Sequence, residues 1–342
     1  MHPDRPLSDN RIRLVCGTIG IISFVLNAIV LVSLLKLRSI YVRNIFIILA
    51  LLQVFYLVQN LHFTIFYIPF IYMPVSGGYC IGLLCEKYRI PFLAHHSLCI
   101  FLIVNICGLF VLLLFYRHQN LIGAQSRFKL GTCSAIVAPV LLVLGINALP
   151  IRFSVRSFLL LDQDDQQRML RKLCPSCDWA ERNRNYGVQD SEDVIINGCI
   201  ILVTVAVYAV YGFACSADVC RAIARHRWET MPYGCRIKIS QTLQSLVQTG
   251  LFALFLAVPI LLFMTVQFHD FEDDSVVLLP SIFLLSLNSL AHCGVMIVTT
   301  RPIRESAIRL MRNGLLLGPT ASQQLTIISS TTHEPRSTAV KR

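Results

Sequence analysis

Residues 91–115 read PFLAHHSLCIFLIVNICGLFVLLLF, an apolar run that contains no Asp, Glu, Lys or Arg. The run exceeds the ~20 apolar residues that an α-helix needs to cross ~30 Å of hydrocarbon. A helix is the expected conformation because a backbone in lipid has no water to bond and must satisfy its own polar groups. This stretch therefore predicts a membrane-spanning helix.

Six further runs of this kind occur along the chain. Of the 342 residues, 55% are hydrophobic and 14% are charged, and the mean hydropathy is +0.64. A soluble domain carries about 25% charged residues. The seven predicted spans cover roughly residues 14–35, 45–68, 91–115, 130–151, 194–215, 243–266 and 276–300. The sequence thus predicts an all-α membrane protein, a seven-transmembrane helix bundle over residues 14–300 between an N-terminus of residues 1–13 and a tail of residues 301–342.

The distribution of charge orients the predicted bundle, since seven spans place the two termini on opposite sides of the membrane. The side with loops 36–44, 116–129 and 216–242 and the tail carries 18 Lys and Arg against 4 acidic residues. The opposite side carries 12 Lys and Arg against 15 acidic residues. Loops rich in Lys and Arg face the cytoplasm, so we expect the N-terminus outside. The basicity is then a signal of topology, and no nucleic-acid partner is expected.

The tail is expected to begin with a short amphipathic helix over residues 303–315. Ile303, Ala307, Leu310 and Met311 share one face of this helix, and its Arg residues lie elsewhere. Such a helix lies on the inner leaflet, where anionic lipids attract Arg. A solvated helix is the alternative. The Ser- and Thr-rich remainder of the tail has the composition of a disordered segment.

The interiors of the predicted spans hold neutral polar residues and almost no charged ones. Transporters and charge-ringed channels place ionisable residues at this depth, so their near absence argues against both classes. One interpretation of the polar residues is structural, because a hydrogen bond between helices contributes about 0.6 kcal/mol. The other is a ligand pocket, for which the candidates are His95, His96, Asn105, Asn288 and His292.

No catalytic or cofactor-binding motif is visible. His95 and His96 are adjacent, so on a helix they point ~100° apart. Cys174 and Cys177 have the Cys-x-x-Cys spacing that also suits zinc or redox chemistry, but a second pair of ligands is missing nearby. We therefore expect no enzyme activity, no metal and no cofactor.

Short motifs in the first two spans resemble those of rhodopsin-like receptors. Residues 26–30 read LNAIV, similar to an Asn-x-x-Val pattern. Residues 49–53 read LALLQ, with Gln53 where those receptors carry Asp. A neutral Gln offers no carboxylate to a hard cation, so the sodium site of such receptors is not expected here.

Other motifs resemble the nematode serpentine chemoreceptors, most closely class H (Srh). They follow one another in order over nearly the whole chain, at residues 68–74, 77–83, 109–121, 173–175, 239–259 and 301–304. The resemblance implies a seven-helix fold like that of G-protein-coupled receptors.

The resemblance also implies roles for particular residues. Arg117 stands at the family's Glu-Asn-Arg-His motif and is expected to contact the G protein or the sixth span, with snorkelling to the membrane interface as the alternative. Phe115 stands where the family carries Glu, so the local acidic partner of this Arg is missing. Receptors of this kind join the top of the third span to the second outer loop, which implies a disulfide from Cys174 to either Cys80 or Cys85.

The function implied is that of a chemosensory G-protein-coupled receptor. It would detect a small, uncharged environmental molecule and signal to a heterotrimeric G protein from the plasma membrane, in the cilia of sensory neurons. The alternative is a seven-span ligand-gated channel subunit or a transporter. An N-terminus inside the cell or rings of charge in the spans would favour that alternative.

Overall fold

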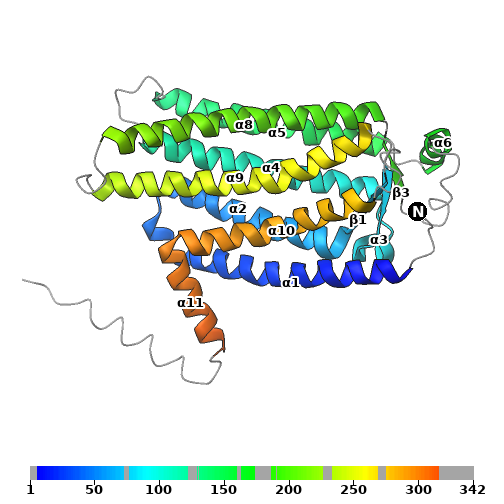
Figure 1. The fold of residues 1–342 in the computed structure, drawn as a ribbon, viewed down its shortest axis with the longest axis horizontal. Coiled ribbons are helices and arrows are strands. Elements are labelled where there is room, and N and C mark those ends of the chain that lie inside the picture. The colour runs from blue at the N-terminus through cyan, green and yellow to red at the C-terminus, as the bar shows by residue number, and fades with distance from the viewer. Residues whose placement is uncertain are drawn as a thin grey trace, which may run out of the picture.

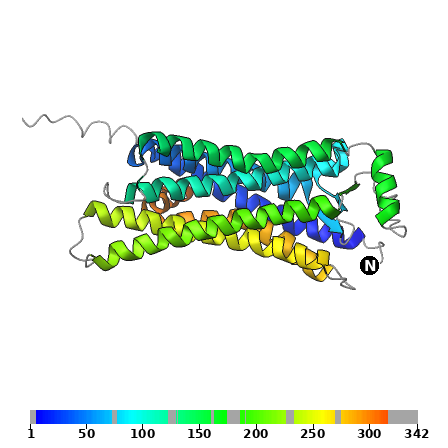
Figure 2. The ribbon, with the colours of Figure 1, turned by 90° about the horizontal axis from the view of Figure 1, so that it is seen from above.

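The computed structural model describes residues 6–72, 77–121, 129, 131–159, 163–173, 186–189, 191–225, 233–268 and 275–315. Long helices that run side by side make up most of this part of the chain (Figures 1 and 2). Cys174, Cys177 and the Ser- and Thr-rich end of the tail lie outside the described residues.

Each predicted span overlaps a long helix. The first three correspond to α1 (Pro6–Lys36), to α2 (Arg43–Leu61) with its π-helical continuation η2 (His62–Tyr67), and to α4 (Phe92–Leu121). The others correspond to α5 (Thr132–Leu159), α8 (Ser191–Arg225), α9 (Tyr233–Phe268) and α10 (Ser275–Thr299). A short 3-10 helix, η1 (Arg38–Ile40), joins α1 to α2. Three of these helices, α1, α8 and α9, extend beyond both ends of the apolar runs that predicted them.

Apolar side chains cover the outside of the bundle, and polar ones lie within it. Phe213 is 76% exposed and Leu14 is 72% exposed, whereas Asn27 and Gln53 are fully buried. This is the distribution expected when the surrounding solvent is hydrocarbon, because lipid accepts Phe and Leu but offers no hydrogen bond to an amide.

Length and composition mark three of the described helices as able to cross a membrane: Arg11–Lys36, Arg43–Tyr67 and Phe92–Asn120. A fourth is added if Phe283–Thr299 and Arg301–Arg312, which meet at a bend of 107°, are taken together. The bend separates α10 from α11 (Arg301–Leu315), which turns away from the bundle at the end opposite the N-terminus (Figure 1).

A buried amide network holds the first, second and last long helices together. Asn27 of α1 donates from Nδ2 to Ser289 Oγ of α10 at 2.8 Å. Gln53 of α2 donates from Nε2 to Asn27 Oδ1. Nearby, Asn60 of α2 donates to the carbonyl oxygen of Gly20 at 2.8 Å. The structural interpretation of these span residues therefore holds for Asn27, Gln53 and Asn60.

A small sheet caps the end of the bundle near the N-terminus. Strands β1 (Pro69–Tyr72), β2 (Gly77–Cys80) and β3 (Tyr186–Val188) pair antiparallel in the order β1-β2-β3. The helix α6 (Gln163–Leu173) contacts this sheet, because the Val188 amide donates to Gln166 Oε1 at 2.6 Å. Two segments that are far apart in sequence thus form one cap (Figure 1).

The cap carries a disulfide that differs from the one expected. Cys80 ends β2, and Cys85 lies one turn into α3 (Leu83–Tyr88), with 5.9 Å between their Cα atoms. The two cysteines bond each other. The prediction of a bond from Cys174 to Cys80 or Cys85 is therefore wrong for this structure, because the turn after β2 brings the two candidate partners together.

The amphipathic helix α11 is used differently from what its sequence suggested. Ile303 and Ala307 are fully buried, and Ile303 packs into an apolar cluster with Val30, Leu34 and Met296 of the bundle. Only Met311 of the predicted apolar face is exposed. The part of α11 from Arg301 to Ala307 therefore docks on the bundle. An ion pair from Arg301 to Glu305, 2.7 Å long, crosses this helix on the exposed side and lowers the pKa of that carboxyl.

The close packing of the turn before α3 can be tested by substitution of Gly82. A Cβ on Gly82 would collide with the backbone of Phe66 and Tyr67 at the end of η2. We expect Gly82→Ala to lower the stability of the protein in detergent by about 2 kcal/mol or more, because backbone atoms cannot move aside as a flexible side chain can. Thermal unfolding measures this loss.

Gly17→Ala in α1 is the matched control, since nothing lies within 4 Å of the Cβ that it adds. This variant should be neutral or slightly stabilising, because Ala is the better helix former. Equal effects of the two substitutions would show that the α3 turn is not packed as described.

Candidate functional site

The first group of candidate residues lies beneath the cap and contains His62, Tyr67, His95 and His96, here named the outer histidine cluster. His62 enters from η2, and His95 and His96 come from the first turn of α4. His62 Nε2 and His95 Nδ1 are 3.2 Å apart. The Tyr67 hydroxyl and His96 Nδ1 are 3.0 Å apart.

Ring stacking fixes the outer histidine cluster in place. The Tyr67 ring stacks on His62 at 5.4 Å and on His95 at 5.6 Å between centroids. His96 stacks on Phe92 at 5.6 Å. His62, Tyr67 and His95 are at most 3% exposed. His95 and His96 point in different directions on their helix, as expected. Each has a polar partner on η2, which is His62 for His95 and Tyr67 for His96.

The backbone at the end of η2 is what presents His62 and Tyr67 to α4. Ile68 follows η2 with φ of 36°, a left-handed conformation that is costly for a β-branched residue. Pro69 comes next, and proline disfavours an α-helical conformation in the residue before it. The chain therefore leaves the helix abruptly at Ile68 and enters β1, which keeps Tyr67 facing inward.

The second group lies deeper and surrounds His292, here named the central aromatic group. His292 stacks on Tyr56 at 4.4 Å and meets Phe110 edge-on at 5.5 Å. Asn288 of α10 is also buried and lies about one helical turn before His292. Neither ring nitrogen of the buried His292 has a partner among the described residues. Leu285 and Ile103 pack against the apolar cluster that contains Tyr67 and also against the one that contains Tyr56 and Phe110.

Asn105 does not join either group. Its Nδ2 donates to Asn147 Oδ1 at 3.0 Å, and Asn147 Nδ2 donates back to Asn105 Oδ1 at 3.3 Å. This reciprocal amide pair links α4 to α5. The geometry supports a structural role for Asn105 in place of the predicted role in a ligand pocket.

Arg117 lies at the other end of α4 and is 3% exposed. Its Nη1 donates to Ser245 Oγ at 2.6 Å and to the carbonyl oxygen of Gln241, both on α9. A snorkelling anchor would extend into solvent or lipid headgroups, so the burial of Arg117 argues against that role. Burial raises the pKa of the nearby Tyr41 phenol, and the positive charge of Arg117 opposes this rise.

Among the described residues, no acid beside Arg117 replaces the one that the motif lacks at Phe115. Residues two apart on a helix do not face each other, and the Phe115 ring lies edge-on to Tyr116 at 5.6 Å. A neutral hydroxyl and a carbonyl from α9 take the place of the acid. Arg117 is thus held by hydrogen bonds to α9.

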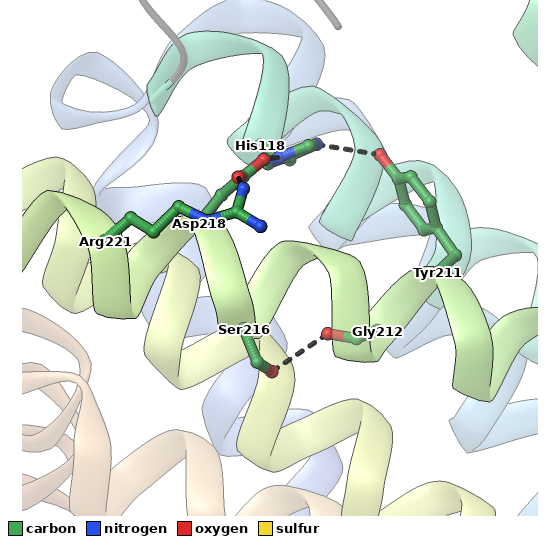
Figure 3. Close-up of polar contacts among 6 residues, drawn as sticks. All are labelled: His118, Tyr211, Gly212, Ser216, Asp218 and Arg221. Carbon is green, nitrogen blue, oxygen red and sulfur yellow. Dashed lines mark hydrogen bonds and ion pairs between the residues drawn. The ribbon is translucent and has the colours of Figure 1, made fainter.

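The neighbouring His118 contacts a carboxylate of another helix. Its Nε2 lies 2.9 Å from Asp218 Oδ2 of α8, and its Nδ1 lies 3.2 Å from the Tyr211 hydroxyl (Figure 3). Arg221 also donates to Asp218, at 2.6 Å. Adjacent residues of α4 therefore bind two different helices, Arg117 binding α9 and His118 binding α8.

Comparison with known families decides the class of the protein. The family model described as "Serpentine type 7TM GPCR chemoreceptor Sri" matches residues 12–306, which extend from α1 into α11. The chain belongs to this family. It is therefore a seven-transmembrane, multi-pass membrane receptor of a non-enzymatic family. No curated protein matches the chain.

Membership of the Sri family corrects the expected class. The sequence motifs favoured class H, which is also a nematode serpentine receptor family. Motifs of a few residues distinguish serpentine receptors from other proteins better than they distinguish one class from another. The match to the Sri family covers most of the chain and outweighs them.

Three functional candidates escaped the sequence prediction: His62, His118 and Asp218. Like His95, His62 is an imidazole inside an apolar run, and this was a signal in the sequence. Asp218 is one of few acids on the basic side of the chain, which was an available signal. The pairing of His118 with Asp218 across 100 residues had no local signal.

The pairing of His118 with Asp218 predicts energetic coupling between α4 and α8. His118→Phe and Asp218→Asn should each lower thermal stability, because the first removes a buried partner of Asp218 and Tyr211 and the second replaces a charged acceptor of the buried imidazole by a weaker neutral one. The double variant should cost little more than the worse single one, with a coupling energy of about 1–3 kcal/mol. Thermal unfolding of all four proteins in detergent gives this energy.

Arg221→Gln serves as the control, because the Arg221 side chain is 62% exposed and such pairs contribute ~0–1 kcal/mol. Strictly additive effects of His118→Phe and Asp218→Asn would contradict the ion pair.

Proposed function

We propose that this receptor of the Sri family binds a small, uncharged molecule from outside the cell and signals to a heterotrimeric G protein inside it. The observation that carries the proposal is the arrangement of α4. One end of this helix holds His95 and His96 beneath the cap, and the other holds Arg117 and His118 against α9 and α8. The two ends are about 33 Å apart along the helix axis.

The outer end of the bundle suits recognition of a neutral ligand. The outer histidine cluster and the central aromatic group combine buried rings with imidazole nitrogens. Among the described residues, the ion pairs lie on the cap, near the inner end of the bundle and on α11, and none involves these two groups. A charged ligand would lose its hydration here without gaining a counter-ion, which is costly.

The inner end suits coupling to a G protein. A ligand shifts a two-state bundle only by binding one state better than the other. The contacts of Arg117 with Ser245 and Gln241 are the kind of buried hydrogen bonds that break when α4 and α9 separate. We propose that ligand binding releases them and makes Arg117 available to the G protein.

Sidedness and location belong to the same proposal. The sheet, α6 and the N-terminus lie at one end, and α11 lies at the other (Figure 1). The excess of positive charge on the side of the tail supports an N-terminus outside the cell. The protein would then act at the plasma membrane of sensory neurons, in their cilia.

The test of the proposed function is a ligand screen of the expressed receptor with a G-protein readout, at matched surface levels. A response to uncharged small molecules that needs the G protein is the expected result. Ligand-gated ion current that persists without any G protein would contradict it and favour a channel.

Arg117 gives a prediction that separates signalling from anchoring. Lys keeps the charge and a long stem but lacks the planar fork of donors that the guanidinium, once released from Ser245 and Gln241, would offer to the G protein. We expect Arg117→Lys to reach the cell surface at the wild-type level and to lose most of the ligand-evoked signal. Arg309→Lys on the exposed side of α11 is the control and should signal normally. Full signalling by the Arg117 variant would leave this residue with only an anchoring role.

A further inference from the structure

The outer histidine cluster contains a pair of imidazoles whose hydrogen bonding is incomplete. His62 and His95 are each 3% exposed and use one nitrogen on each other. The remaining nitrogens, His62 Nδ1 and His95 Nε2, have no partner among the described residues. Buried polar atoms nearly always find a partner, so two vacant ones on one pair require an explanation.

The chemistry of the pair limits what it can bind. Both imidazoles are expected to be neutral. A buried charge without a counter-ion is costly, and none of the ion pairs among the described residues includes His62 or His95. One nitrogen of the central contact must donate and the other must accept. If His62 Nε2 carries the proton, then His62 Nδ1 accepts and His95 Nε2 donates. If His95 Nδ1 carries it, the two outer nitrogens exchange roles.

Either tautomer therefore offers one free donor and one free acceptor. A ligand with a hydroxyl group can bind at either outer nitrogen, and a carbonyl oxygen can accept from whichever nitrogen carries the proton. A hydrocarbon satisfies neither nitrogen. A metal ion is not indicated, because no group of three or more potential ligand residues is formed within the described part of the chain.

His96 lies next in sequence and does not share this property. Its Nδ1 is within hydrogen-bond distance of the Tyr67 hydroxyl, and its ring stacks on Phe92 and contacts Phe153. Tyr67 also stacks on both members of the pair. The structure thus orders the pair from one side by ring contacts and leaves its outer nitrogens without a partner.

We infer that the His62–His95 pair is the hydrogen-bonding anchor for an uncharged ligand that carries a hydroxyl or carbonyl group. This inference rests on the proposed function, because it names the ligand class of the receptor. The pair recognises the oxygen of the ligand, and the aromatic residues around it contact its apolar part.

The first arm of the test needs no ligand. His62→Leu/His95→Leu removes both vacant nitrogens together with the contact that joins the rings. Each single variant leaves a lone imidazole with two vacant nitrogens, the same number as in the wild type. The double variant should melt about 2 °C or more above the wild type in detergent. Replacing both partners by apolar groups removes the free-energy penalty of burying unpaired ring nitrogens. Neither single variant should do so.

His96→Leu is the matched comparison and should melt below the wild type, because it leaves the buried Tyr67 hydroxyl without its partner. His62→Phe/His95→Phe keeps the ring contacts with Tyr67 and serves if the Leu pair folds poorly. A double variant that melts below the wild type in both forms would overturn the inference, since water would then complete the bonds of a structural pair.

The second arm measures the G-protein response to butyl through decyl members of a matched series of alkanes, alcohols, ketones, carboxylates and amines. The wild type should respond to alcohols or ketones. His62→Leu and His95→Leu should each weaken that response by about tenfold or more, as expected for loss of one hydrogen bond. His95→Gln, which keeps a donor and an acceptor, should recover part of it.

The outcomes of this arm separate the two claims. Responses confined to alkanes, or to charged members of the series, would overturn the ligand class while leaving the proposed receptor function intact. An unchanged alcohol response in both Leu variants would also overturn the inference. Absence of any G-protein response, in this series and in a broad screen, would count against the proposed function, and the melting experiment would still decide the state of the pair.

Discussion

Hydrocarbon offers no hydrogen bonds, and this constraint organises the whole structure. A polar group inside the bundle must find a partner in its own helix or in another one, and a buried group that finds none costs free energy. The side-chain NH2 groups of Asn27 and Gln53 meet the constraint by donating to Ser289 and Asn27, which joins α1, α2 and α10. Asn105 and Asn147 meet it by joining α4 and α5. The neutral polar residues that stand out in the sequence are thus, for the most part, the contacts that hold the helices together.

The same constraint distinguishes the residues with a functional role. At His62, His95 and His292, ring nitrogens are buried without a partner among the described residues, so contacts between helices do not account for these histidines in full. Arg117 presents the opposite case. It is a buried charge held by a hydroxyl and a carbonyl oxygen from α9, and no acid of the described part of the chain strengthens this contact. Both features lie on or against α4, which connects the outer and inner ends of the molecule.

Much of this architecture follows from the sequence because apolar runs of about 20 residues admit one solution in lipid. The seven-helix class and the helix after the seventh span were predicted correctly for that reason. The burial of Ile303 and Ala307 was not predicted, because periodicity identifies an apolar face without showing what covers it. The disulfide was mispredicted because the turn at Gly82, which brings Cys85 back to Cys80, depends on the end of η2.

The candidate site was predictable only in part. Single residues such as His95, His292 and Arg117 stand out against an apolar background. Their partners depend on how helices rotate against one another, so the sequence could not pair His62 with His95 or His118 with Asp218. The class H assignment failed because short motifs carry too little information to separate related receptor classes.

The central claim is that the outer histidines and Arg117 belong to one switch, in which ligand binding outside separates α4 from α9 inside. Distance measurement by pulsed electron resonance tests this most directly, with spin labels on unnatural residues at the exposed positions Asn120 of α4 and Ser240 of α9. The account predicts that an activating ligand shifts the distance distribution to longer values, as the Arg117 contact with Ser245 opens. A receptor that signals in response to ligand while this distribution stays unchanged would contradict it.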